Sequence, residues 1–154
     1  MTNPTFDFSH LSISERVARF TLYQVAGEPY LDMVHAGESN KPYFNALLKR
    51  SRKNVRRMRA GAMDANTMAQ NRDEDRTLYP RYVIKGWGCK KGPGIILDSK
   101  ANEISYSEEN LRTFLNALPN WLFDDVRLFA SEEANFVDEQ EGEEIPNPEV
   151  VSGN

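Results

Sequence analysis

The sequence contains a single cysteine, Cys89, two histidines, His10 and His35, and no apolar run long enough to cross a membrane. One cysteine excludes an intramolecular disulfide and any zinc site built from several cysteines. No metal-ligand spacing surrounds the histidines, so we expect surface or turn histidines. Cys89 lacks the surroundings of a nucleophile, and we expect a half-buried loop cysteine. These absences predict a protein without catalytic residues, metal or cofactor.

Composition gives the expected class. The 154 residues are 40% hydrophobic and 27% charged, which is typical of a soluble globular chain. We predict a single α+β domain at 1–137, with an N-terminal β-hairpin followed by a small helical region. The acidic segment 138–154 has too little apolar surface to fold alone, so we predict a tail that is flexible or ordered by a partner. The opening residues do not resemble a secretion signal, and we expect a cytoplasmic protein.

The formal net charge of -4 conceals two segments of opposite charge. Between Lys41 and Arg59 there are cations and no carboxylates, whereas no cation follows Arg127. We predict a basic partner-binding surface made of Lys49, Arg50, Arg52, Lys53, Arg56, Arg57 and Arg59. We predict an acidic partner-binding tail that includes Glu139, Glu141, Glu143, Glu144 and Ile145. The two segments can attract each other in neighbouring copies, which predicts self-association.

The basic cluster also permits a second interpretation, because clustered cations are typical of proteins that bind nucleic-acid phosphates. The sequence pI of 5.3 and the lack of a base-reading motif favour a protein partner over nucleic acid. Nucleic-acid binding therefore remains the alternative.

Alternation of apolar and polar residues at 19–25 predicts a strand, and 30–34 is its expected partner across the Gly- and Pro-containing turn at 26–29. Segment 39–54 is predicted as a helix capped by Ser39 or Asn40. We expect a connection or a frayed helix at 59–71.

A stripe of apolar residues predicts a second helix at 73–87, although Pro80 is unfavourable inside it. The glycine-rich segment 86–94 is predicted as a loop; it lacks the ending of a nucleotide-binding loop. The acidic pairs Asp73 with Asp75 and Asp124 with Asp125 are expected on solvated helix faces.

The last third predicts a second hairpin from 95–97 and 103–106, and then two helices. Ser107 is the expected cap of the first helix, which buries Leu111, Phe114, Leu115 and Leu118. Pro119 begins the second helix, whose apolar residues are Trp121, Leu122, Val126 and Phe129. We predict that Trp121 and Phe129 anchor the core, so that alanine at either position costs about 3 to 5 kcal/mol.

Four segments in a fixed order carry a resemblance: VIKGW at 83–87, NEISYSEEN at 102–110, LPNWLFDDV at 118–126 and ANF at 134–136. Over roughly 78–136 the chain resembles small morphogenesis proteins of tailed bacteriophages, in particular the tail assembly chaperone-like group. The resemblance implies a non-enzymatic protein that contacts other phage structural proteins in the host cytoplasm during tail assembly. The alternative that it implies is a structural component retained in the virion. Its core or docking residues are Trp87, Tyr106, Trp121 and Phe129.

Overall fold

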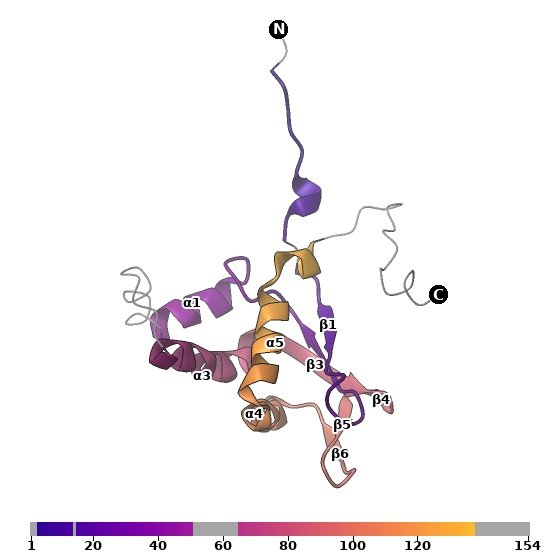
Figure 1. Cartoon of the computed structure of the whole chain (residues 1–154). Coiled ribbons are helices and arrows are strands. Elements are labelled where there is room, and N and C mark those ends of the chain that lie inside the picture. The colour runs from indigo at the N-terminus through magenta and orange to yellow at the C-terminus, as the bar shows by residue number, and fades with distance from the viewer. Residues whose placement is uncertain (1–2, 14, 51–64, 138–154) are drawn as a thin grey trace.

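The chain folds as an α+β protein in the computed structural model, which describes residues 3–13, 15–50 and 65–137 (Figure 1). An antiparallel sheet has the strand order β1 (Ala18–Thr21), β2 (Tyr30–Met33), β3 (Ile84–Cys89) and β4 (Gly92–Pro93). Strands β5 (Ile95–Leu97) and β6 (Glu103–Ser105) form a separate antiparallel pair. The helices are α1 (Lys41–Arg50), α3 (Ala65–Tyr82), α4 (Glu108–Ala117) and α5 (Asn120–Ser131), with short 3-10 helices η1 (Ser9–Leu11) and η2 (Glu133–Phe136).

The predicted N-terminal hairpin is confirmed, with Phe20 opposite Leu31 in its register. Gly27 adopts a positive φ of 84° in the turn, a conformation that glycine takes without steric cost. Leu22, Leu31 and Met33 are fully buried, so the pair contributes one face to the core. The predicted second hairpin is also confirmed, as β5 and β6.

The helix predicted at 73–87 is wrong in its second half. Helix α3 ends at Tyr82, and the next residues form β3, which pairs with β2 some fifty residues earlier in the chain. The spacing of Val83 and Trp87 would place them on one apolar stripe of a helix. Pairing with β2 overrides that local pattern. The predicted loop 86–94 is likewise wrong, because β3 and β4 use most of it.

Gly88 lies in β3 at a position where the sheet leaves no room for a side chain. The Tyr30 ring of β2 lies over Gly88, and a Cβ atom there would come 2.2 Å from the Tyr30 hydroxyl oxygen. Cys89, expected in a loop, is a buried residue at the end of β3.

Helix α1 is confirmed, with Asn40 as its cap: the Asn40 side-chain oxygen accepts a hydrogen bond of 3.3 Å from the Tyr43 N–H. Beyond Arg50 the predicted helix lies outside the described residues. Part of the segment expected as a connection or frayed helix is helical, because α3 begins at Ala65.

The C-terminal helical pair is confirmed, and the Ser107 side chain accepts from the Asn110 N–H at 3.0 Å as the cap of α4. Leu111, Leu115 and Leu118 are buried, whereas Phe114 is half-buried against the core. Trp121 contradicts its prediction, since 57% of it is exposed. Helix α5 instead buries Leu122, Phe123, Val126 and Ala130, because that face is the one turned toward the sheet and α3.

A polar network joins α1, α3 and α5 inside the helical layer. The Asp75 carboxylate on α3 accepts hydrogen bonds of 2.7 Å from the Tyr43 hydroxyl and from Arg127 Nε. Arg127 also donates to Asp124, which accepts two bonds of 2.9 Å from Arg72. Asp75 was expected on a solvated face; it is only 5% exposed, because α1 and α5 cover its side of α3.

Candidate functional site

The predicted binding surfaces are only partly visible. Lys49 and Arg50 lie exposed at the end of α1. Arg52, Lys53, Arg56, Arg57 and Arg59 lie outside the described residues, as do Glu139, Glu141, Glu143, Glu144 and Ile145. The contact between basic and acidic segments therefore stays a prediction.

The four residues expected in the core or at a docking surface divide into two kinds. Trp87 is 2% exposed, and its ring packs edge-on against Tyr106 and Phe114. The Tyr106 hydroxyl donates to the Ile84 carbonyl at 3.1 Å. Phe129 is half-buried against Phe20, with ring centroids 5.0 Å apart. Trp121, in contrast, lies on the exposed face of α5.

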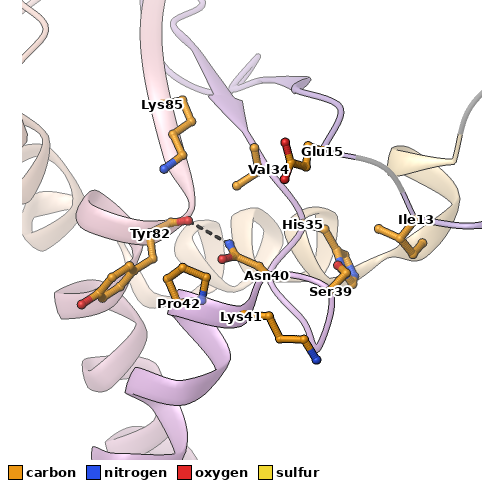
Figure 2. A pocket seen from close by; sticks show the side chains of 10 residues that line it. All are labelled: Ile13, Glu15, Val34, His35, Ser39, Asn40, Lys41, Pro42, Tyr82 and Lys85. Atoms are coloured by element: carbon orange, nitrogen blue, oxygen red, sulfur yellow. Dashed lines mark hydrogen bonds between the residues drawn. The ribbon is translucent and has the colours of Figure 1, made fainter.

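A cleft of about 530 Å³ opens where β2 meets the start of α1 (Figure 2). This volume falls in the range of small-ligand pockets. It is lined by Ile13, Glu15, Val34, His35, Ser39, Asn40, Lys41, Pro42, Tyr82 and Lys85.

His35 and Ser39 form the most chemically suggestive pair in this cleft. The expectation of a surface histidine is wrong, because His35 is 7% exposed and packs against Phe136. Its Nε2 lies 3.3 Å from the Ser131 carbonyl oxygen, which can only accept, so Nε2 carries the hydrogen. Nδ1 is hydrogen-bonded to the Ser39 hydroxyl at 2.8 Å. Nε2 thus ties the segment after β2 to the end of α5, and Nδ1 ties it to the turn before α1.

The remaining polar contact in the cleft is structural as well. The Asn40 side chain donates to the Tyr82 carbonyl at 2.8 Å, which attaches the start of α1 to the end of α3 (Figure 2). We therefore interpret this cleft as a junction between elements.

A second hollow surface follows the free edge of β1. Two adjoining depressions share Arg19, Phe129 and Asn135, and together we call them the edge groove. The edge groove is lined by Arg16, Val17, Ala18, Arg19, Phe20, Thr21, Tyr23, Gln24, Asp32, Asp125, Leu128, Phe129, Glu132, Ala134, Asn135 and Val137.

The backbone of β1 offers hydrogen-bonding groups to this groove. β1 is the first strand of the sheet order, and in the described ranges it pairs with β2 alone. The Leu22 N–H donates to the Pro29 carbonyl at 2.8 Å, so by antiparallel alternation Phe20 and Ala18 also face β2. The N–H and C=O groups of Arg19 and Thr21 consequently point away from the sheet.

Exposed apolar side chains lie around this edge, among polar and charged ones that include Asp125 and Glu132. Val17, Tyr23 and Leu128 are 51%, 73% and 64% exposed, and the paired rings of Phe20 and Phe129 lie between β1 and α5. In the sequence, alternation predicts the hairpin and helical spacing predicts α5. Neither pattern shows that side chains from the two elements converge on one groove.

Charge in the groove is held in place. Arg19 donates to both carboxylate oxygens of Asp32, at 2.8 and 3.3 Å, and its guanidinium lies 3.7 Å from the centre of the Tyr30 ring. The Asp32 carboxylate raises the pKa of the Arg19 guanidinium. Arg19 thus forms a surface ion pair across β1 and β2, with its own side chain 56% exposed.

Two kinds of feature are absent from the described ranges. No helix there is both long and apolar enough for a membrane crossing. Residues 3–13, 15–50 and 65–137 also hold no group of three or more histidine, cysteine or acidic side chains placed to bind a metal ion.

Comparison with protein families shows a similarity over most of the chain. The family model of the YdaY prophage protein matches residues 39–147, from the turn before α1 to beyond η2. β1 and β2 precede the matched range, which includes the α5 side of the edge groove. Neither the curated proteins nor the solved structures include a match.

Proposed function

The chain belongs to the YdaY prophage protein family and is thus phage-related, and from this premise we propose that it acts by binding other proteins through the edge groove. We propose a non-enzymatic role in phage particle morphogenesis, at the stage of tail assembly and in the host cytoplasm. A structural component retained in the virion is the second form of the same proposal.

One observation carries the binding role: among the described residues β1 pairs on one side alone, and exposed apolar side chains lie beside its other edge. Proteins usually protect such edges with lysines, prolines, bulges or a covering segment, because an open edge pairs with other chains. Here the charge of Arg19 is held by Asp32, and Val17, Tyr23 and Leu128 surround the edge. An extended segment of a partner can add to such an edge through main-chain hydrogen bonds, with side chains giving specificity.

Site-specific photocrosslinking tests this proposal. A benzophenone amino acid at Tyr23 or Leu128 should give adducts with a phage-encoded protein, or with the chain itself, during phage production in the host. Lys100 is the matched control, since it is exposed on the β5–β6 turn, away from the edge groove. Equal adducts at all three positions, or none at Tyr23 and Leu128, would refute a role for the groove.

Mass spectrometry of purified particles separates the two forms of the proposal. Many copies per particle favour a retained structural component, whereas absence from particles favours an assembly factor. In both cases, crosslinks from Tyr23 or Leu128 support the edge groove as the binding site.

The opposite charges of the basic and acidic segments favour a second contact. We propose that the acidic tail binds the basic segment of a neighbouring copy or of another phage protein, through many weak ion pairs that salt screens. A truncation that tests this contact should end at Val137. It then keeps Phe136, which is fully buried, and Val137, which pairs with Ile13.

Deletion of 138–154 should leave the melting temperature unchanged and remove the part of self-association that declines with salt, measured by sedimentation. Association with the same salt dependence in the truncated chain would contradict this contact. Salt-dependent DNA binding by the full chain would favour the nucleic-acid alternative instead.

A further inference from the structure

We propose that the edge groove binds the N-terminal arm, residues 3–11, of a second copy of this chain, so that two copies exchange arms. This inference rests on the proposed function, because it names the partner of the same groove.

The arm is an exposed apolar segment. Phe6, Phe8 and Leu11 are 76%, 63% and 55% exposed. The rings of Phe6 and Phe8 lie parallel, with an interplanar angle of 1° and centroids 6.2 Å apart, so both occupy one side of the chain. Exposed aromatic rings at alternate positions are what a strand presents to an apolar surface.

The direction of the arm favours a second copy over the arm's own groove. The arm joins the body where Ile13 pairs with Val137, next to one end of the edge groove. Ser12 is extended, with φ -68° and ψ 139°, so the chain does not reverse there. In Figure 1 the arm runs away from the body rather than along α5. Because arm root and groove are adjacent, a two-fold pair can place each arm in the other copy's groove.

The chemistry of the two surfaces matches. The arm residues 3–7 lie in no helix or strand, so on binding they can take up an extended conformation and supply main-chain partners for the outward N–H and C=O groups of Arg19 and Thr21. An added strand lies about 4.8 Å from β1, which brings Phe6 and Phe8 onto the side of Leu128 and Phe129. Phe6 and Phe8 supply the apolar part of this contact, beside charged groove residues that include Arg16, Asp125 and Glu132.

The size of the contact is sufficient for a specific dimer. Each phenylalanine can bury on the order of 150 Å². Two exchanged arms with two rings each, together with the groove surface they cover, bury roughly 1,000 Å², which is near the lower limit for a specific interface.

Cysteine crosslinking tests the exchange directly, since the native Cys89 is buried. Tagged chains with Phe8→Cys are mixed with untagged chains with Leu128→Cys under mild oxidation. The expected product is a disulfide-linked pair of one tagged and one untagged chain, formed in large excess over a mixture with Lys100→Cys. Equal yields with Leu128→Cys and Lys100→Cys would overturn the proposal. A single chain that carries both Phe8→Cys and Leu128→Cys gives a further outcome. An intrachain disulfide as its main product would overturn the proposal too, because the arm would then occupy its own groove.

Sedimentation equilibrium of the full chain gives the second readout. Phe6→Asp with Phe8→Asp should weaken dimerisation by at least about 30-fold, as expected when hot-spot side chains are lost, and the dimer should resist salt. Phe6 and Phe8 are exposed, so the melting temperature of this variant should equal that of the wild type. A wild-type chain that stays monomeric, or a variant that dimerises as tightly, would overturn the inference.

The two proposals can fail separately. Suppose that Tyr23 and Leu128 crosslink to a different phage protein, and that Phe6→Asp with Phe8→Asp does not change dimerisation. The arm exchange is then refuted, whereas the groove remains a binding site. Loss of both readouts refutes both.

Discussion

The two faces of helix α5 contrast sharply. One face buries Leu122, Phe123, Val126 and Ala130, all 2% exposed or less, against α3 and the sheet. The other presents Trp121 and Leu128, seven residues apart and therefore on the same side, at 57% and 64% exposure. Helix α5 therefore carries apolar side chains that its own core does not bury, apart from those on its buried face. Apolar residue type alone therefore does not distinguish a core residue from a docking residue.

The largest expected effect breaks the buried face. Phe123→Ala should cost about 3 to 5 kcal/mol of unfolding free energy, because the fully buried ring packs edge-on against Tyr79 at 5.6 Å. Urea unfolding measures the loss. Leu128→Ala on the opposite face is the control and should change stability by less than about 0.5 kcal/mol. Similar costs at both positions would show that α5 is buried on both sides.

A smaller effect is expected at the boundary between the faces. Hydrogen bonds from Arg72, and then Arg127, lower the pKa of the Asp124 carboxyl below 3.8. A carboxyl with a lowered pKa in the folded state stabilises the fold above its ordinary pKa, and this contribution is lost as the pH falls through the folded value. Since Asp124 is 38% exposed, Asp124→Asn should cost less than about 1 kcal/mol at neutral pH.

Unfolding of the Asp124→Asn variant across pH checks this sign. The cost relative to the wild type should disappear as the pH falls below 3.8. Asp125→Asn is the matched control, because it removes the adjacent carboxylate of the same helix. A cost that is constant with pH would contradict the ion-pair interpretation.

The smallest expected effect on stability concerns the exposed face. Trp121→Ala should change the unfolding free energy by less than about 0.5 kcal/mol, in place of the 3 to 5 kcal/mol expected for a core residue. Fluorescence offers a second measurement, because the chain has two tryptophans and the variant retains buried Trp87. Its emission should shift to shorter wavelength and resist iodide quenching. Unfolding of the variant would return Trp121 to the core.

Local signals predicted much of the fold. Alternation around Phe20, the Gly27 turn, the Asn40 and Ser107 caps and the Pro119 corner each depend on a few neighbouring residues, and all predict elements that the structure contains. Residues 83–88 could not be assigned in this way, because their strand exists only through pairing with β2. The edge groove was missed for the same reason, since hairpin and helix residues meet there only after the chain folds.

The sequence by itself determined the elements, their caps and the amount of apolar surface available, because these follow from backbone preferences and side-chain spacing over a few residues. Packing between distant segments sets the burial of Asp75, the exposure of Trp121 and the pairing of β3 with β2. It also leaves the outer edge of β1 without a partner strand in residues 3–13, 15–50 and 65–137. Those outcomes depend on which surfaces compete for burial across distant segments, and that competition is settled only when the helices and the sheet pack together.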